Sequence, residues 1–342
     1  FEDKLIEFEI ETILGEDKSS KIKINSELEA LSSLQVIEKR DDYVEGEAGE
    51  YISNSIYEGD LKSIFYRNDE RPMPDYTQAI VSMVLDTSGS MGYKMGDGTR
   101  IGIMKNQAKQ LIEKFSENKL GTTKINLIPF DSTANIVNEG NWVKFYNPKT
   151  NHEKKEEDGK SIQYNLLDKL KANGGTNVGD GMRRSYYTIL DHNKTNEDKD
   201  KNKYIIILMD GVPTYASVKE KDGYQYLMGN GNSYYQKGPG NESSDFVMNY
   251  IGEISENLLK KIKDSKGKAN LKVFLIGFSD DDKDFKELEN VRKQITNKNI
   301  PAEIMKAKSD GELNEVFNKI KDIVLEDTWH IEGPPVEVSN EK

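Results

Sequence analysis

The chain has 342 residues, contains no cysteine and carries a formal net charge of -12 at pH 7, with a sequence pI near 5.0. This acidic balance argues against nucleic acid or an anionic membrane surface as a partner, because phosphate binding needs a basic face. The missing cysteines exclude disulfides, zinc–thiolate sites and cysteine catalysis. No apolar run reaches the roughly 20 residues of a membrane span. Because the sequence starts at Phe1 rather than at methionine, we expect a processed or trimmed chain.

The length predicts one large domain with a smaller attachment, and residues 1–74 read as the attachment, a small β-rich module with a linker. Ile6, Phe8 and Ile10 alternate with glutamates, and Lys21 to Asn25 alternates again after a turn-like GEDKSS, which predicts a hairpin. A helix from Lys4 to Leu14 fits almost as well, so both interpretations remain open. Further elements are expected before a proline-rich linker at 71–75: a helix at Leu28–Glu38 and strands at Tyr51–Tyr57 and Leu61–Tyr66.

Apolar strands alternate with amphipathic helices from residue 75 to residue 326. The predicted strands are Ala79–Leu85, Lys124–Phe130, Asn135–Val137 continuing toward Trp142, Tyr204–Met209, Leu271–Phe278 and Ile300–Met305. The predicted helices are Arg100–Asn118, Ile162–Ala172, Gly179–His192, Ser243–Ser265, Asp282–Thr296 and Asp310–Leu325. Strands that are apolar on both faces and separated by helices predict an α/β fold, a doubly wound and mainly parallel sheet with helices on both faces. Residues 327–342 are expected to form a C-terminal tail.

Hard oxygen donors follow two of the predicted strands. Asp86, Ser88 and Ser90 come directly after Ala79–Leu85 in a glycine-containing loop that precedes a helix. Thr176 lies in the glycine-led turn GGTNVGDG, and Asp210 ends the apolar strand YIIILMDG. Because the carboxyl ends of parallel strands share one edge of a sheet, we expect these five residues to surround one point. Carboxylates and hydroxyls suit Mg²⁺ or Mn²⁺ rather than soft metals.

This ordered set of motifs resembles the von Willebrand factor type A domain, also called the integrin I-like domain, over about residues 77–326. The resemblance implies that the five oxygen-bearing residues hold one Mg²⁺ or Mn²⁺, directly or through water, and that the ion captures a carboxylate of another protein. It also implies that movement of the last helix, Asp310–Leu325, switches affinity.

A von Willebrand-type domain with a small β-rich module resembles the tip adhesins of Gram-positive bacterial pili. This likeness implies a location on the bacterial cell surface or pilus, with pilin subunits of a filament as partners. It also implies host or extracellular matrix ligands of the fibronectin, fibrinogen or collagen class, and a pilin-like first module. An intracellular adaptor subunit that partners an ATPase is the alternative, and it would need a separate motor, since no ATP-binding loop occurs here.

Enzymatic activity is not expected. His152, His192 and His330, which are all the histidines of the chain, lie in charged stretches or in the tail, so none is an obvious base for Ser88 or Ser90. No lysine or arginine is expected to accompany the motif at a phosphate-binding turn. A calcium-loop spacing at Asp280, Asp282 and Asp284 lacks the required glycine and closing glutamate, so a helix N-terminus is expected there.

Three long loops interrupt the α/β pattern. Residues 147–159 and 193–202 are rich in charge and are expected to be solvated surface. Tyr215 to Gly240 combines tyrosines with glycine and asparagine, a composition typical of adaptable recognition loops, so we predict that it selects the partner. A surface loop pinned by its tyrosines is an equally weighted alternative. The tyrosines are Tyr215, Tyr224, Tyr226, Tyr234 and Tyr235.

Overall fold

The computed structural model divides into two compact units, residues 1–75 with 330–342 and residues 76–329. The structure describes residues 10–13, 19–26, 34–38, 77–117, 122–134, 144–149, 159–195, 201–233, 235–263 and 271–326. Several predicted features lie outside these residues: the strands at 51–57, 61–66 and 135–142, the linker at 71–75 and the tail at 327–342.

The described part of the first unit is an antiparallel sheet in the order β1-β2-β3, made of β1 (Ile10–Ile13), β2 (Ser19–Ser26) and β3 (Leu34–Glu38). Ile10 pairs with Ile22 and Ile24 pairs with Val36. The predicted hairpin is therefore confirmed over the described residues, and the alternative helix is wrong over 10–13, whereas Ile6 and Phe8 lie outside the described residues. The helix predicted at 28–38 is also wrong over β3, because the β-branched Val36 and Ile37 favour an extended chain that completes the ladder with β2.

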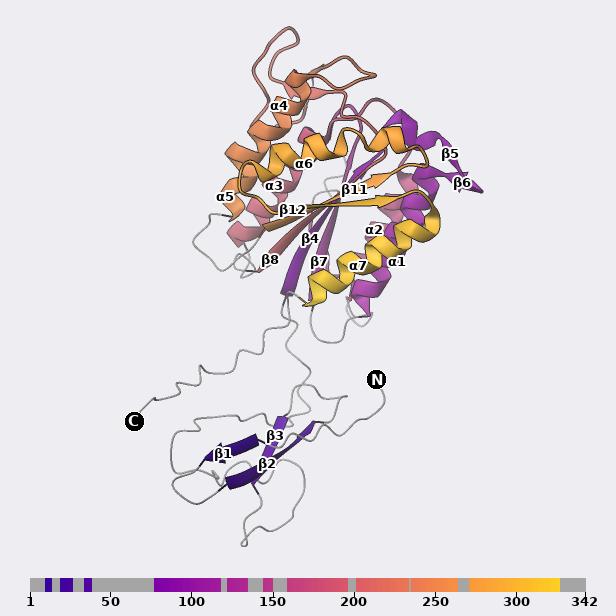
Figure 1. The fold of residues 1–342 in the computed structure, drawn as a ribbon. Coiled ribbons are helices and arrows are strands. Elements are labelled where there is room, and N and C mark those ends of the chain that lie inside the picture. Colours follow the sequence, from indigo (N-terminus) through magenta and orange to yellow (C-terminus); the bar gives the residue numbers. More distant parts are fainter. Residues whose placement is uncertain are drawn as a thin grey trace. The chain divides into compact units, whose positions relative to one another are not determined.

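The second unit contains a five-stranded parallel sheet in the order β12-β11-β8-β4-β7 (Figure 1). Its strands are β4 (Thr77–Asp86), β7 (Thr122–Phe130), β8 (Asn202–Met209), β11 (Leu271–Phe278) and β12 (Ala302–Ala307). Two small antiparallel hairpins flank it, β5 (Lys94–Met95) with β6 (Gly98–Thr99) and β9 (Ala216–Val218) with β10 (Tyr235–Lys237). The predicted strands that fall on described residues are confirmed.

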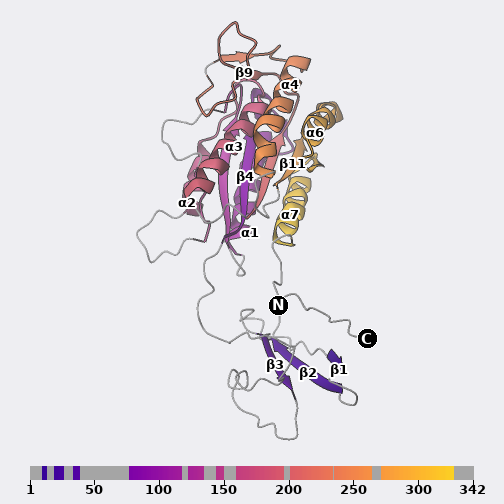
Figure 2. The same cartoon turned by 90° about the vertical axis from the view of Figure 1, so that its left-hand side faces the viewer.

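Helices cover both faces of this sheet, which confirms the doubly wound α/β fold (Figures 1 and 2). One face is covered by α1 (Arg100–Ser116), α2 (Gly159–Lys169) and α7 (Asp310–Glu326). The other is covered by α3 (Val178–Thr195), α4 (Asp245–Ile254), the π-helical η6 (Ser255–Leu259), α5 (Lys260–Lys263) and α6 (Leu288–Thr296). None of the described helices is long and apolar enough to cross a membrane.

Two of the predicted helices are less regular than expected. The segment predicted as one helix at 243–265 passes through the π-turn of η6, where the Ser255 hydroxyl donates to the carbonyl of Ile251. The segment predicted as a helix at 282–296 begins with the 3₁₀-turn η7 (Asp282–Phe285), and α6 starts only at Leu288. The Asp281 side chain accepts from the backbone N–H of Lys283 and fixes this tight turn.

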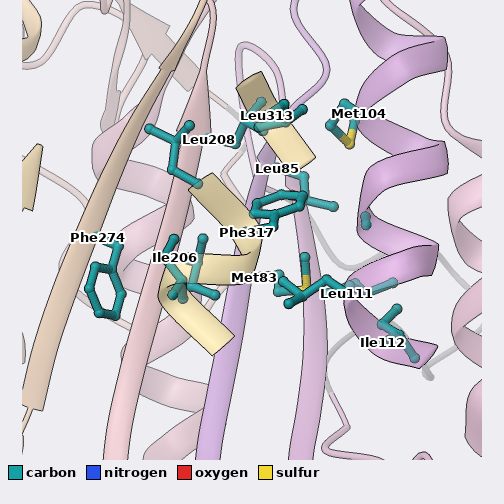
Figure 3. Packing of buried hydrophobic residues seen from close by; sticks show 14 of the residues in the cluster. Met83, Leu85, Met104, Leu111, Ile112, Ile206, Leu208, Phe274, Leu313 and Phe317 are labelled. Atoms are coloured by element: carbon teal, nitrogen blue, oxygen red, sulfur yellow. The ribbon is translucent and has the colours of Figure 1, made fainter. Parts of the chain in front are cut away.

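Each face of the sheet has its own hydrophobic cluster because the β4 side chains alternate between them. Met83 and Leu85 point to the face of α1 and α7, where they meet Met104 and Phe317, as Figure 3 shows. Val84 points to the opposite face, toward the cluster formed with α3, α4 and α6. Burial on both faces is why the strands read as continuous apolar runs.

The chain reverses its winding between β4 and β8, which are neighbours in the sheet. Helix α1 follows β4 onto one face, whereas α4 follows β8 onto the other. Such a switch point leaves a crevice at the carboxyl ends of the two strands, where ligands bind in open α/β sheets. Asp86 and Asp210 stand at these two ends.

Candidate metal centre

Asp86 is the last residue of β4, and its carboxylate is fully buried. The backbone N–H of Ser88 donates to its Oδ1 at 2.7 Å, and the N–H of Asp210 lies 3.4 Å from its Oδ2. The hydrogen bond from the Ser88 N–H closes a tight turn of the chain on the Asp86 side chain, directly after the strand ends. The carboxylate is thereby fixed at the sheet edge, as predicted.

The two predicted serines connect the aspartates. Ser88 and Ser90 lie in and beside the short 3₁₀-helix η4 (Gly89–Gly92), with their Oγ atoms 3.1 Å apart. The Ser90 hydroxyl donates to Asp210 Oδ1 at 2.7 Å. Four of the five predicted ligands therefore form one hydrogen-bonded group, although Ser90 and Asp210 are 120 residues apart in the sequence.

Thr176, the fifth predicted ligand, is buried in a loop that is bonded to the loop after β4. Gly89 donates to the carbonyl of Gly174 at 2.9 Å, and Asn173 donates to the carbonyl of Thr87 at 2.8 Å. Gly174 has φ of +69°, a conformation that favours glycine, and the Thr176 N–H donates to Thr214 Oγ1 at 2.9 Å. The loop that carries Thr176 is thus joined to the site by the backbone bonds of Asn173 and Gly174.

The electrostatics of the two aspartates favour a bound cation. Burial and then the nearby charge of Asp210 raise the pKa of Asp86 well above its ordinary value. Burial also raises the pKa of Asp210, against hydrogen bonds from Ser90 and Arg100 that lower it. Among the described residues, Asp86 has no ion-pair partner. Two buried carboxylates with hydroxyls beside them fit a hard divalent ion, which would supply the missing positive charge.

Arg100 is a member of this centre that the sequence analysis missed. Its Nη1 donates to Asp210 Oδ2 at 3.1 Å, and the sequence analysis did not predict this contact. Arg100 is the first residue of α1, where the positive end of the helix disfavours a cation. A basic residue at that unfavourable position was the available signal, because it requires acidic partners elsewhere in the fold.

Comparison with known protein families covers the part of the chain that contains the candidate centre. The family model of the von Willebrand factor type A domain matches residues 81–212, which include all five predicted ligands. The chain contains a von Willebrand factor type A domain. A comparison with curated proteins finds no match.

Solved structures resemble the chain beyond the span of the family model. The PilB minor pilin from Streptococcus sanguinis has a TM-score of 0.62 at 21% identity, over 79% of this chain and 66% of that one. The pilus adhesin SpaC from Lactobacillus rhamnosus GG has a TM-score of 0.51 at 19% identity, over 74% of this chain and 31% of that one. The chain thus spans less than two thirds of either protein. At these identities the likeness demonstrates a shared fold.

Outside the aspartates, the von Willebrand factor type A domain offers few competing metal ligands. The described residues contain no group of three or more His, Cys, Asp or Glu side chains placed to hold a metal. Of the acids with calcium-loop spacing, Asp280 and Asp284 contact Arg100, and Asp282 pairs with Lys308 at 2.7 Å. Each of these three acids is therefore paired with a basic side chain of the domain.

His192 is the one histidine among the described residues, and it lies at the end of α3 that is distant from Thr176. The ring of His192 lies in the last turn of α3 with its centroid 5.0 Å from that of Phe145. Thr176 precedes the opposite end of the same helix. His152 and His330 lie outside the described residues.

The predicted tyrosine-rich loop of the domain is folded rather than irregular. Its ends pair as β9 and β10, and the buried Arg183 and Arg184 of α3 hold its middle by donating to the carbonyls of Gly231 and Asn230 at 2.8 and 2.5 Å. The sequence analysis did not find these arginines, which lie on a helix that precedes the loop.

The tyrosines of this loop divide into two groups. Tyr215 packs against Gly175 and Gly240, and the Tyr226 hydroxyl donates to the carbonyl of Phe246 at 2.8 Å. Tyr224 is 76% exposed and Tyr235 is 41% exposed. Tyr234 lies outside the described residues. The loop therefore combines anchoring tyrosines, as one interpretation predicted, with exposed tyrosines that recognition would need.

Proposed function

We propose that the chain is a metal-dependent adhesion module that binds a carboxylate of a protein ligand through one Mg²⁺ or Mn²⁺ ion. The observation that carries this proposal is the hydrogen-bonded group of Asp86, Ser88, Ser90 and Asp210 at the switch point of the sheet. Asp86 and Asp210 would hold the ion together with the hydroxyls of the two serines and of Thr176. A bound ion would supply an electrophilic coordination position for an incoming carboxylate.

The residues around the centre support capture of a ligand from outside. Asp86, Ser88 and Asp210 are buried, whereas Gly89, Asn173 and Gly174 of the surrounding loops are exposed. The candidate ligands therefore lie directly beneath the surface of the domain. The carboxylates of Asp86 and Asp210 match the charge of a divalent ion without exceeding it, and Arg100 beside Asp210 adds one positive charge, so one carboxylate from a partner would complete the balance. This arrangement favours binding over catalysis.

The setting that we propose is the surface or the pilus of a bacterium. The support is the likeness to a minor pilin and to a pilus adhesin, since both proteins are pilus components by name. Pilin subunits are then partners of the chain, with the first unit as a pilin-like attachment. Host or matrix proteins of the fibronectin, fibrinogen or collagen class are the ligands. The same likeness favours this role over that of an intracellular adaptor for an ATPase.

Binding to a panel of immobilised matrix proteins tests the proposal. We expect binding in Mg²⁺ or Mn²⁺, loss of binding in EDTA, and a loss of at least about tenfold in affinity for Asp86→Ala, because one coordinating charge is removed. Asp97→Ala is the control, since it removes an exposed acid from the hairpin near the centre. Equal binding by the wild-type chain in Mg²⁺ and in EDTA would contradict a metal-dependent mechanism.

We further propose that Tyr224 and Tyr235 contribute to ligand selection. The ammonium group of Lys237 lies 3.2 Å from the centroid of the Tyr224 ring, and this contact holds an exposed aromatic in place. Tyr224→Ala should weaken ligand binding by about tenfold while leaving the affinity for Mg²⁺ unchanged. Unchanged ligand binding by Tyr224→Ala and Tyr235→Ala would assign the loop a structural role only.

A further inference from the structure

One guanidinium group connects the candidate metal centre to a second loop. Arg100 Nη1 donates to Asp210 Oδ2 at 3.1 Å, while Nη2 donates to Asp280 Oδ1 at 2.8 Å, to Asp284 Oδ2 at 3.3 Å and to Ser279 Oγ at 2.8 Å. Ser279, Asp280 and Asp284 belong to the connection between β11 and α6. A single positive charge is therefore shared between the centre and this connection.

The position of Arg100 is unfavourable apart from these contacts. The Arg100 side chain is 6% exposed, it stands at the positive end of α1, and its Nε is buried without a hydrogen-bond partner. The carboxylates that it contacts must offset these costs. They differ in setting, because the side chain of Asp210 is buried whereas that of Asp280 is 56% exposed. The interaction with Asp280 can therefore change without rearranging the core.

We propose that Arg100 is an internal counter-cation that lowers the affinity of the centre for a divalent ion, and that Asp280 limits this effect by sharing Arg100 with Asp210. The inference rests on the proposed function only in assigning a divalent ion to Asp86 and Asp210. Arg100 is a positioning residue, since it acts on the ion through the Asp210 carboxylate. Because Arg100 offsets part of the negative charge of Asp210, the bound ion would attract a ligand carboxylate more strongly.

Removing the positive charge of Arg100 should strengthen Mg²⁺ binding rather than weaken it. Arg100→Met retains an apolar stem of similar length but leaves Asp210 with a full negative charge. By Coulomb's law at an effective dielectric constant near 20, we expect Mg²⁺ to bind about tenfold or more tightly. In EDTA the same variant should unfold at a lower temperature, because a buried carboxylate has lost its partner. A purely structural role for Arg100 would predict weaker metal binding instead.

Two acids of the β11–α6 connection provide a matched pair. Asp280→Asn removes a carboxylate that contacts Arg100, whereas Asp282→Asn removes an equal charge whose partner is Lys308. In Asp280→Asn, Arg100 should interact more strongly with Asp210, so Mg²⁺ should bind about two- to threefold more weakly. Asp282→Asn should change the Mg²⁺ affinity less. In the Arg100→Met background, Asp280→Asn should have no greater effect than Asp282→Asn.

Isothermal titration of the whole chain with Mg²⁺, with melting curves in EDTA, decides between the outcomes. Unchanged or weaker Mg²⁺ binding by folded Arg100→Met overturns the inference. Equal effects of Asp280→Asn and Asp282→Asn on the Mg²⁺ affinity overturn the claim that Asp280 limits the effect of Arg100. If Arg100→Met does not fold, the Asp280 and Asp282 pair decides alone. A wild-type chain that binds neither Mg²⁺ nor Mn²⁺ overturns the proposed function as well, whereas metal binding with an unchanged Arg100→Met affinity overturns only this inference.

Discussion

The buried carboxylate of Asp86 lowers the stability of the metal-free fold, and a bound cation would offset this cost. Its carboxylate is buried at the end of β4, beside the carboxylate of Asp210, and both charges disfavour the metal-free fold. Asparagine has nearly the same shape and no charge. The cost of the aspartate is therefore measurable in the absence of metal, and it is offset when a cation binds.

The stability of Asp86→Asn relative to the wild type should depend on pH. Burial and Asp210 raise the pKa of Asp86 in the folded chain above the ordinary value of about 3.9, so the folded chain holds more protons than the unfolded chain between these two values. The wild type therefore loses stability as pH rises through the raised pKa. In EDTA we expect Asp86→Asn to be the more stable protein near neutral pH, with the difference shrinking as the pH falls.

Urea unfolding in EDTA across a series of pH values measures this difference. In excess Mg²⁺ the order should reverse, because only the wild type gains stability from the ion. A stability difference that does not vary with pH would show that the Asp86 carboxyl keeps the same protonation state throughout.

The sequence could reveal the candidate ligands of the centre but not their electrostatic partners. Asp86, Ser88 and Ser90 are visible because they follow an apolar strand at short spacing, and Asp210 because it ends another. Arg100 is 110 residues from Asp210 and 184 residues from Asp284, so its contacts depend on the order of strands in the sheet. Local periodicity carries no information on such contacts.

At the scale of elements, α3 packs unusually closely on the sheet. A Cβ atom added to Gly181 would lie 2.6 Å from Val84 Cγ1 and 3.2 Å from Phe130 Cδ1. Gly181→Ala should therefore destabilise the domain by about 1–2 kcal/mol, since an overpacking cost of about 1–3 kcal/mol exceeds the gain in helix propensity of up to about 1 kcal/mol. Thermal or denaturant unfolding measures the change.

Gly311 in α7 is the matched control for Gly181, because nothing lies within 4 Å of a Cβ atom added there. Gly311→Ala should stabilise the domain by about 0.5–1 kcal/mol through helix propensity alone. If the two variants changed stability in the same direction, close packing of α3 against β4 and β7 would not be the cause.

The tyrosine-rich loop depends on two buried arginines of the same helix. Arg184 donates to the carbonyls of Ala134 and Asn230 and to the side chain of Asn232. Burial, and then the charge of Arg183, lowers the pKa of Arg184 to about 10, so it remains a cation near neutral pH. Because its partners in the loop include the side-chain oxygens of Asn230 and Asn232 as well as a backbone carbonyl, the arginine fixes the loop partly through these two asparagines.

Arg184→Met should loosen this loop more than the rest of the domain. The buried carbonyl of Ala134 would lose its partner at a cost of about 1–3 kcal/mol, so we expect a loss of about 2 kcal/mol in stability. Hydrogen exchange should become faster at Leu227, whose N–H donates to the carbonyl of Ser217 within the loop. Arg292→Met, which removes an arginine paired with Glu289 on the surface of α6, should change stability by less than about 0.5 kcal/mol. Exchange that remained slow at Leu227 would contradict the anchoring role of Arg184.

The regular elements were predictable, whereas their irregular turns were not. Strands such as β8 and β11 are apolar on both faces, and the helices between them have one apolar side, so the α/β pattern is visible in the sequence. The π-turn at Ser255 and the 3₁₀-turn after Asp281 depend on single side-chain hydrogen bonds. The error over Leu34–Glu38 arose because a short apolar run fits either period until a partner strand is known.

At the scale of the whole molecule, the two units differ in what their described residues provide. Both hydrophobic clusters are formed by residues between Ala79 and Val324, within the unit 76–329. All five predicted metal ligands and Arg100 also belong to that unit. Folding and metal binding should therefore be properties of residues 76–329.

We expect residues 76–329, produced alone, to unfold in one cooperative transition and to bind Mg²⁺ as tightly as the full chain. Residues 76–300 are the matched control, because they lack β12 and α7 and with them Leu313 and Phe317 of the first cluster (Figure 3). That shorter fragment should fail to fold, since one face of β11 and β8 loses its cover. Circular dichroism and calorimetric titration with Mg²⁺ compare the three proteins. A fragment 76–329 that melted without cooperativity, or that lost its affinity for Mg²⁺, would mean that the centre depends on the first unit.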